Sequence, residues 1–186
     1  MTPANYITLS RIALIPLFMW AMLSTAPYSE IVALLIFVVA SVTDAVDGYI
    51  ARRFHQVTNL GKFIDPLADK LLVTSALLMF VQNGQISSVP AMIIITRELM
   101  ITSLRMVAVA AGRVIAAGWE GKVKTCVQIV CIAFLLTGQG GAAIFGATGF
   151  RWDDMVVWLM TAVTAWSGAA YLYKHKDVLR KDNERH

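Results

Sequence analysis

Residues 44–70 read DAVDGYIARRFHQVTNLGKFIDPLADK, and this stretch decides what kind of protein the chain is. It contains four aspartates, Asp44, Asp47, Asp65 and Asp69, in or beside sequence that otherwise has the composition of lipid-buried helix. An ionised carboxylate inside a bilayer is costly, and such residues usually mark a functional site. The stretch therefore predicts a buried acidic site whose charge is offset by a bound group or by protonation.

The composition of the whole chain is that of a membrane protein. Of 186 residues, 58% are hydrophobic and only 15% are charged, whereas an ordinary soluble domain is about 45–50% apolar. The mean hydropathy is +0.65. We predict an all-α integral membrane protein, a single domain of residues 1–186 with a short N-terminal juxtamembrane segment and six transmembrane helices in one bundle. The predicted spans are 9–26, 30–51, 63–82, 88–111, 123–145 and 153–173.

Basic residues gather at one end of these spans. They follow the second span (Arg52, Arg53, Lys62), the fourth (Arg113, Lys122, Lys124) and the sixth (the tail from Lys174 to Arg185). The positive-inside rule therefore places both termini and the aspartate hairpin in the cytoplasm. The net charge of +4 lies in the same juxtamembrane segments, which favours anionic lipid headgroups as partners and argues against nucleic acid.

The spacing of the aspartates brings them together at one depth. Asp44 and Asp47 are three residues apart, and Asp65 and Asp69 are four apart, so each pair shares one helix face. At an effective dielectric constant of 20, two carboxylates about 5 Å apart repel by roughly 3 kcal/mol. Either several are protonated, or divalent cations bind among them. Hard oxygen ligands favour Mg²⁺ or Mn²⁺ over zinc, and four carboxylates suit two ions.

Three neighbouring residues indicate that a phosphate group binds at the same place. Gly48 and Gly61 lack side chains where a ligand would approach the backbone, and Arg52 places a fixed cation at the cytoplasmic rim. A metal site beside a guanidinium is typical of phosphoryl transfer.

These residues match a complete motif. The pattern D-x2-D-G-x2-A-R-x8-G-x3-D-x3-D is met by Asp44, Asp47, Gly48, Ala51, Arg52, Gly61, Asp65 and Asp69, and it resembles the signature of the CDP-alcohol phosphotransferases. Eight required positions on two helices are far more specific than a lone glycine motif. The resemblance implies a Mg²⁺-dependent reaction in which a hydroxyl nucleophile displaces CMP from a CDP-linked lipid or alcohol.

The resemblance also implies roles for the individual residues. Asp44, Asp47 and Asp65 would hold the metal ions, and Asp69 would complete the metal site and act as the catalytic general base. The CDP-lipid would lie against Asp44, Gly48, Ala51, Arg52, Gly61, Asn5 and Thr8. The family further implies a homodimer.

The rest of the chain is most similar to family members that use sn-glycerol 3-phosphate as acceptor in bacterial phospholipid synthesis. The similarity is carried by PANYITLSRIALIP (3–16), GKFIDPLADKLL (61–72), ITRELMITSLRMVA (95–108) and GKVKTCVQ (121–128). It implies CDP-diacylglycerol as donor, phosphatidylglycerophosphate and CMP as products, and an inner (cytoplasmic) membrane location. An acceptor that carries its own phosphate needs additional cations, for which the candidates are Arg97, Arg105, Lys122 and Lys124.

Several alternatives stay open at this stage. Arg97 and Glu98 would equally well pair with each other to lower their cost in the membrane, and Lys122 and Lys124 would serve as headgroup anchors. A family member with serine, inositol phosphate or a second lipid as acceptor has the same aspartate motif, and a divalent-cation transporter would also need buried acids. Pro66 suits the first turn of the third helix, which would then point its N-terminus at the diphosphate.

Overall fold

The computed structural model describes only part of the chain. The backbone is described for residues 3–26, 28–54, 59–110, 118–137 and 152–174. Side chains are described for residues 10–26, 28–43, 70–109, 118–137 and 152–174. The motif aspartates therefore have a described backbone, whereas their side chains lie outside the described residues.

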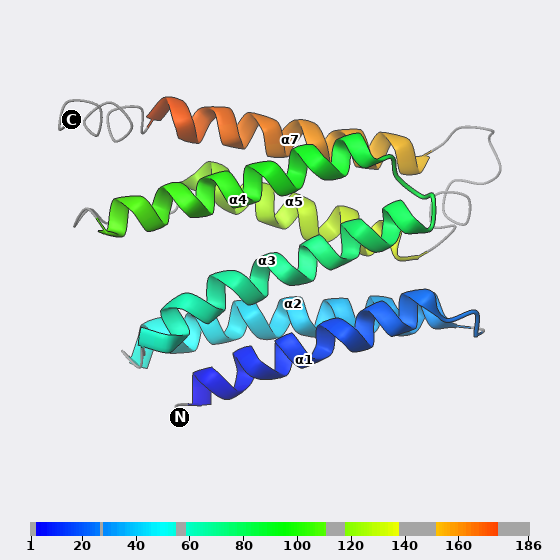
Figure 1. Cartoon of the computed structure of the whole chain (residues 1–186), viewed down its shortest axis with the longest axis horizontal. Helices are drawn as coiled ribbons and strands as arrows, with labels where there is room; N and C mark the ends of the chain where they lie inside the picture. The colour runs from blue at the N-terminus through cyan, green and yellow to red at the C-terminus, as the bar shows by residue number, and fades with distance from the viewer. Residues whose placement is uncertain (1–2, 27, 55–58, 111–117, 138–151, 175–186) are drawn as a thin grey trace. The chain divides into compact units, whose positions relative to one another are not determined.

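The described residues fold into helices and contain no strand, which confirms the all-α prediction. The helices are α1 (Pro3–Leu23), α2 (Ser29–Phe54), α3 (Asn59–Gln82), α4 (Ser88–Ala110), α5 (Trp119–Leu135) and α7 (Trp152–Lys174) (Figure 1). Five of them overlap most of a predicted span. The fifth span was predicted to reach residue 145. α5 ends at Leu135, and Thr137 N–H and Oγ1 both donate to the Phe134 carbonyl just after it; residues 138–145 of the predicted span lie outside the described residues.

The start of α3 corrects the expectation for Pro66. Because α3 begins at Asn59, Pro66 lies beyond the first turn, inside the helix. A proline there removes the hydrogen bond to the carbonyl four residues earlier, but the helix continues through it. α1 likewise continues through Pro16. The N-terminal end of α3 therefore lies at Asn59 and not next to Asp65.

Within the described residues, one helix is long and apolar enough to cross a membrane, by its length and composition. It is α7, with a mean hydropathy of 1.4, and shorter apolar helical segments occur at Ser10–Leu23, Ser29–Thr43 and Lys70–Gln82. α4 has 23 residues but carries Arg97, Glu98 and Arg105 in its central and later turns. The six-span bundle therefore stays a prediction.

The chain divides into two compact units. Unit 1 comprises Met1–Ile86 and Ile132–Asp153, and unit 2 comprises Ser87–Cys131 and Asp154–His186. The boundary crosses α5 between Cys131 and Ile132. Unit 1 therefore contains α1 to α3 with the end of α5, and unit 2 contains α4, most of α5 and nearly all of α7.

In unit 1, α1 packs against both α2 and α3. Phe18 of α1 and Phe37 of α2 are fully buried, with ring centroids 6.2 Å apart and planes tilted by 48°. Such an aromatic pair contributes about 0.5–1.5 kcal/mol beyond its buried area. Ala33 and Ala40 lie four and three residues from Phe37 on the same face of α2 and are also fully buried. This face allows α1 to lie close to the helix that carries the first aspartates.

The described part of unit 2 buries both apolar and polar residues and exposes many large apolar side chains. Its buried apolar residues include Ile94, Ile101, Val157 and Met160. Its buried polar and charged residues are Arg97, Glu98, Lys124, Gln128, Thr161, Thr164 and Ser167. Its exposed apolar residues include Met92, Leu99, Met106, Val130, Trp158, Leu159 and Trp166. Soluble proteins seldom bury several charged and polar side chains while they leave so many large apolar ones exposed.

Candidate active site

The backbone places the four motif aspartates toward the same end of the α2–α3 pair. At 1.5 Å per residue, Asp44 lies about 22 Å along α2 from Ser29, and Asp69 lies about 20 Å along α3 from Gln82. α3 follows α2 after residues 55–58, and Figure 1 shows the end of α2 next to the start of α3. Asp47 and Asp65 lie closer to that end. The positions of the four residues along α2 and α3 are therefore compatible with the prediction that they lie at one depth.

The donor chemistry of these positions fits a divalent cation. Carboxylate oxygens are the preferred ligands of small hard cations, and two helical pairs at i, i+3 and i, i+4 spacing can converge on one centre. Where side chains are described, no group of three or more His, Cys, Asp or Glu side chains is placed to hold a metal ion. The aspartates lie outside that set, as do the side chains of Asn5, Thr8, Gly48, Ala51, Arg52 and Gly61. Their predicted roles stay predictions.

Unit 2 contains a buried ionic cluster built on Glu98. The carboxylate Oε1 of Glu98 accepts from Lys124 Nζ at 2.6 Å and from Arg97 Nη1 at 3.2 Å. The three residues are 4%, 3% and 8% exposed in that order. Burying ions is expensive, and the cost is offset only when each one is paired and hydrogen-bonded. In this cluster two cations, Lys124 and Arg97, share the carboxylate of Glu98.

The third helix of unit 2 holds the other side of Arg97. Arg97 Nη2 donates to Ser167 Oγ at 2.8 Å, and Ser167 Oγ donates to the Glu120 carbonyl at 3.1 Å. Gly168 leaves room for the arginine, because a Cβ on Gly168 would lie 2.9 Å from Arg97 Cγ. Both guanidinium Nη atoms of Arg97 are thus hydrogen-bonded. The pairing with Glu98, which the sequence left open as an alternative, is present, and the role of Arg97 toward the acceptor stays a prediction.

Arg105 has a different environment from Arg97. It lies on α4 eight residues, or about two turns, after Arg97, and its Cζ is 5.6 Å from the centroid of the buried Tyr171 ring. Within the part of the chain that the structure describes, no carboxylate pairs with Arg105, and its buried Nε has no hydrogen-bond partner. Of the two predicted arginines, only Arg97 pairs with a carboxylate among the residues that the structure describes.

The structure does not group all four predicted acceptor cations. Arg97 and Lys124 share Glu98, whereas Lys122 is exposed. Two residues along a helix correspond to a rotation of about 200°, so Lys122 and Lys124 point to opposite faces of α5. Sequence reasoning did not find the Lys124–Glu98 contact or the roles of Ser167 and Gly168. The sequence signal for the Lys124–Glu98 contact was the occurrence of two oppositely charged residues within predicted membrane spans.

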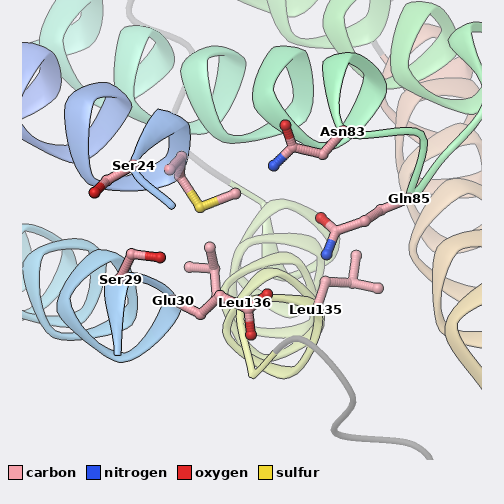
Figure 2. A pocket seen from close by; sticks show the side chains of 8 residues that line it. Ser24, Ser29, Glu30, Asn83, Gln85, Leu135 and Leu136 are labelled. Atoms are coloured by element: carbon pink, nitrogen blue, oxygen red, sulfur yellow. The ribbon is translucent and has the colours of Figure 1, made fainter. Parts of the chain in front are cut away.

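The described cavities do not coincide with the predicted site residues of unit 1. Figure 2 shows a cavity of about 180 Å³ between the end of α1, the start of α2, the loop after α3 and the end of α5. Polar side chains of Ser24, Ser29, Glu30, Asn83 and Gln85 line it together with Met22, Leu135 and Leu136. Glu30 is fourteen residues, or about 21 Å of helix, from Asp44. This cavity therefore lies at the opposite end of unit 1 from the aspartates.

A comparison with protein families gives the class of the chain. The sequence model described as "CDP-alcohol phosphatidyltransferase" matches residues 1–166. The chain belongs to this family. The predicted resemblance is confirmed, and with it the prediction of an enzyme that transfers a group from a CDP-linked donor. A divalent-cation transporter does not account for this match.

Curated relatives resemble the chain over most of its length. A protein of Bacillus subtilis (strain 168), named CDP-diacylglycerol–glycerol-3-phosphate 3-phosphatidyltransferase, is 40% identical over 96% of this chain and 97% of its own. Proteins with the same name are 34% identical in Haemophilus influenzae, over 94% of this chain and 93% of the relative, and 41% identical in Escherichia coli K12, over 70% and 74%.

Proposed function

We propose that the chain transfers the phosphatidyl group of CDP-diacylglycerol to sn-glycerol 3-phosphate, giving phosphatidylglycerophosphate and CMP. The observation that carries the proposal is the complete eight-position motif on α2 and α3, in a chain whose relatives with this named activity align over nearly its full length. The family assignment supports CDP-linked chemistry, and the names of the relatives support the donor and the acceptor.

The reaction needs a base for the acceptor hydroxyl. In the proposed step, the Asp69 carboxylate takes the proton of the glycerol 3-phosphate 1-hydroxyl. The hydroxyl oxygen then forms a bond to the β-phosphorus of CDP-diacylglycerol, and the bond from that phosphorus to the bridging oxygen breaks and releases CMP. The proton stays on Asp69 until it passes to water. Asp69 lies in α3 one turn after Asp65, so one helix face presents both acids.

The four aspartates are the proposed ligands of a divalent cation, with Mg²⁺ or Mn²⁺ as the ion and two ions as the number. When bound, the cation neutralises charge on the diphosphate and stabilises CMP as a leaving group. Asp44, Asp47 and Asp65 supply hard oxygen ligands, and Asp69 completes the set. Asn5, Thr8, Gly48, Ala51, Arg52 and Gly61 are proposed to surround the CDP-lipid, with Arg52 at the rim.

Arg105 is the proposed main contact for the acceptor phosphate. This role is supported by the guanidinium of Arg105, which no described carboxylate neutralises. Arg105 lies on the same helix as Glu98. Lys124 and Arg97 contribute to the same proposed site as the two cations that share Glu98. Lys122 is exposed on another face of α5, which favours a headgroup contact over an acceptor role for this residue.

The proposed location is the bacterial inner membrane, with both termini and the aspartates on the cytoplasmic side. Support comes from the basic juxtamembrane segments and from the many large apolar side chains that the described helices of unit 2 expose. Six spans and a homodimer remain part of this proposal. Three of these spans contain apolar helical segments, which are Ser10–Leu23, Ser29–Thr43 and Lys70–Gln82.

The test is CMP release from CDP-diacylglycerol by the purified chain in detergent. The acceptors glycerol 3-phosphate, serine, inositol phosphate and phosphatidylglycerol are added one at a time. The proposal expects release with glycerol 3-phosphate and a product of the mass of phosphatidylglycerophosphate. Release with one of the other three acceptors alone would assign the chain to another branch of the family.

A further inference from the structure

The inner face of α7 contacts both arginines of α4. Ser167 and Gly168 meet Arg97, and Tyr171, one turn later, meets Arg105. All five residues belong to unit 2, so these contacts lie within one compact unit. The family match ends at residue 166, so Ser167, Gly168 and Tyr171 lie just beyond the matched stretch.

We propose that Ser167, Gly168 and Tyr171 are positioning residues that aim the two arginines of α4 and thereby set the affinity for the acceptor phosphate. This inference rests on the proposed function, because it needs an acceptor that carries a phosphate. It adds α7 as the element that determines how tightly that acceptor binds.

The Ser167 hydroxyl connects the three helices of unit 2. It accepts from Arg97 Nη2 of α4 and donates to the Glu120 carbonyl in the first turn of α5. Because its proton is directed at Glu120, its lone pairs are directed at the arginine. Arg97 Nη1 in turn binds Glu98, which binds Lys124, so the direction of Arg97 is coupled to both cations of the cluster.

Gly168 determines the path of the Arg97 side chain. The aliphatic part of the arginine lies across this glycine, with Cγ, Nε and Cδ at 2.9, 3.7 and 3.9 Å from the place a Cβ would take. A methyl group there must displace the arginine, since a contact of 2.9 Å is too short for two carbon atoms. Gly168 therefore matters because it leaves room for the Arg97 side chain, and not because it makes the backbone flexible.

Tyr171 holds Arg105 through the face of its ring, and this contact does not occupy the N–H groups of the arginine. A guanidinium about 6 Å or less from a ring centroid is attracted to the face of the ring, and 5.6 Å meets that condition. The Nε of Arg105 is buried, and its two Nη groups carry the donors that a phosphate can accept side by side. The buried ring, 7% exposed, fixes where the charge lies.

The test compares acceptor KM, donor KM and kcat for paired variants of the full chain in detergent with saturating Mg²⁺. Tyr171→Leu removes the ring and Tyr171→Phe keeps it, while Tyr173→Leu and Tyr173→Phe are the controls at a tyrosine that is 76% exposed. Gly168→Ala adds the clashing methyl, and Gly121→Ala is its control, because a Cβ there meets nothing within 4 Å. Thermal unfolding is measured for every variant.

We expect Tyr171→Leu to raise the glycerol 3-phosphate KM roughly two- to thirtyfold and Tyr171→Phe to stay within about twofold of wild type. Gly168→Ala should raise the same constant roughly five- to a hundredfold, since small displacements of a positioning group have large effects. In both cases the CDP-diacylglycerol KM and the kcat at saturating acceptor should change less than about twofold.

The outcomes separate this inference from the proposed function. A wild-type chain that releases no CMP with any phosphorylated acceptor overturns the proposed function and this inference together. An active wild type whose Tyr171→Leu and Gly168→Ala variants keep the acceptor KM, or raise donor and acceptor KM equally, overturns the inference alone. Equal effects of Tyr171→Leu and Tyr171→Phe would also contradict it, because the ring is what holds Arg105.

Discussion

Lys124 Nζ lies 2.6 Å from Glu98 Oε1, and the two side chains are 4% and 5% exposed. The residues are 26 positions apart, on α5 and α4. Two ions removed from solvent stabilise a fold only as a pair, since each one alone would be an uncompensated buried charge. This contact joins Lys124, a candidate acceptor cation, to Glu98, which the sequence offered only as a partner of Arg97.

The first prediction concerns the stability of that ion pair. Glu98→Gln leaves Lys124 and Arg97 without their shared carboxylate, so we expect a loss of about 3–5 kcal/mol in the free energy of unfolding. Thermal unfolding in detergent measures it. Lys122→Met at the exposed position is the matched control for Lys124→Met, and only the latter should lower the midpoint. Equal midpoints for the two lysine variants would contradict the pairing.

The second prediction concerns the metal. Because four carboxylates at one depth repel each other strongly, CMP release should stop in EDTA and return when Mg²⁺ or Mn²⁺ is added. The measurement is the rate of CMP release before chelation, after it and after metal is restored. Full activity after rigorous chelation would remove the metal from the proposal.

The third prediction separates the base from the metal ligands. Asp69→Asn keeps the size of the side chain but cannot accept a proton, so turnover should fall by roughly two to four orders of magnitude while CDP-lipid binding largely survives. Asp47→Asn should instead raise the metal concentration needed for half-maximal activity. Both are measured by titrating Mg²⁺ into the CMP-release assay. Near-normal turnover of Asp69→Asn would exclude it as the base.

The fourth prediction ranks the acceptor cations. Arg105→Gln should cost about 1.5–3 kcal/mol of acceptor binding, or roughly ten- to a hundredfold in acceptor KM or kcat/KM, and leave the CDP-diacylglycerol KM nearly unchanged. Lys122→Gln should stay within about twofold of wild type. The two acceptor constants, measured side by side, decide the ranking. A larger effect at Lys122 than at Arg105 would reverse the proposed roles.

Local sequence was sufficient to predict the helices and the family. Long apolar runs predicted helices that overlap α1 to α5 and α7, because apolar content and length are local properties. Their ends were predicted less well. The start of α3 at Asn59 and the end of α5 at Leu135 depend on which backbone groups find partners, as the bonds from Thr137 to the Phe134 carbonyl illustrate.

The sequence by itself determined the aspartate motif, since i, i+3 and i, i+4 spacings within two adjacent helices are a matter of helical geometry. Only the tertiary structure decided how the cations of unit 2 differ. Lys122 and Lys124 are two residues apart, yet one is exposed and the other binds Glu98, and Arg97 and Arg105 meet different residues of α7. Such contacts join helices distant in the chain, and they depend on the rotation and depth at which the helices pack, which no local spacing specifies.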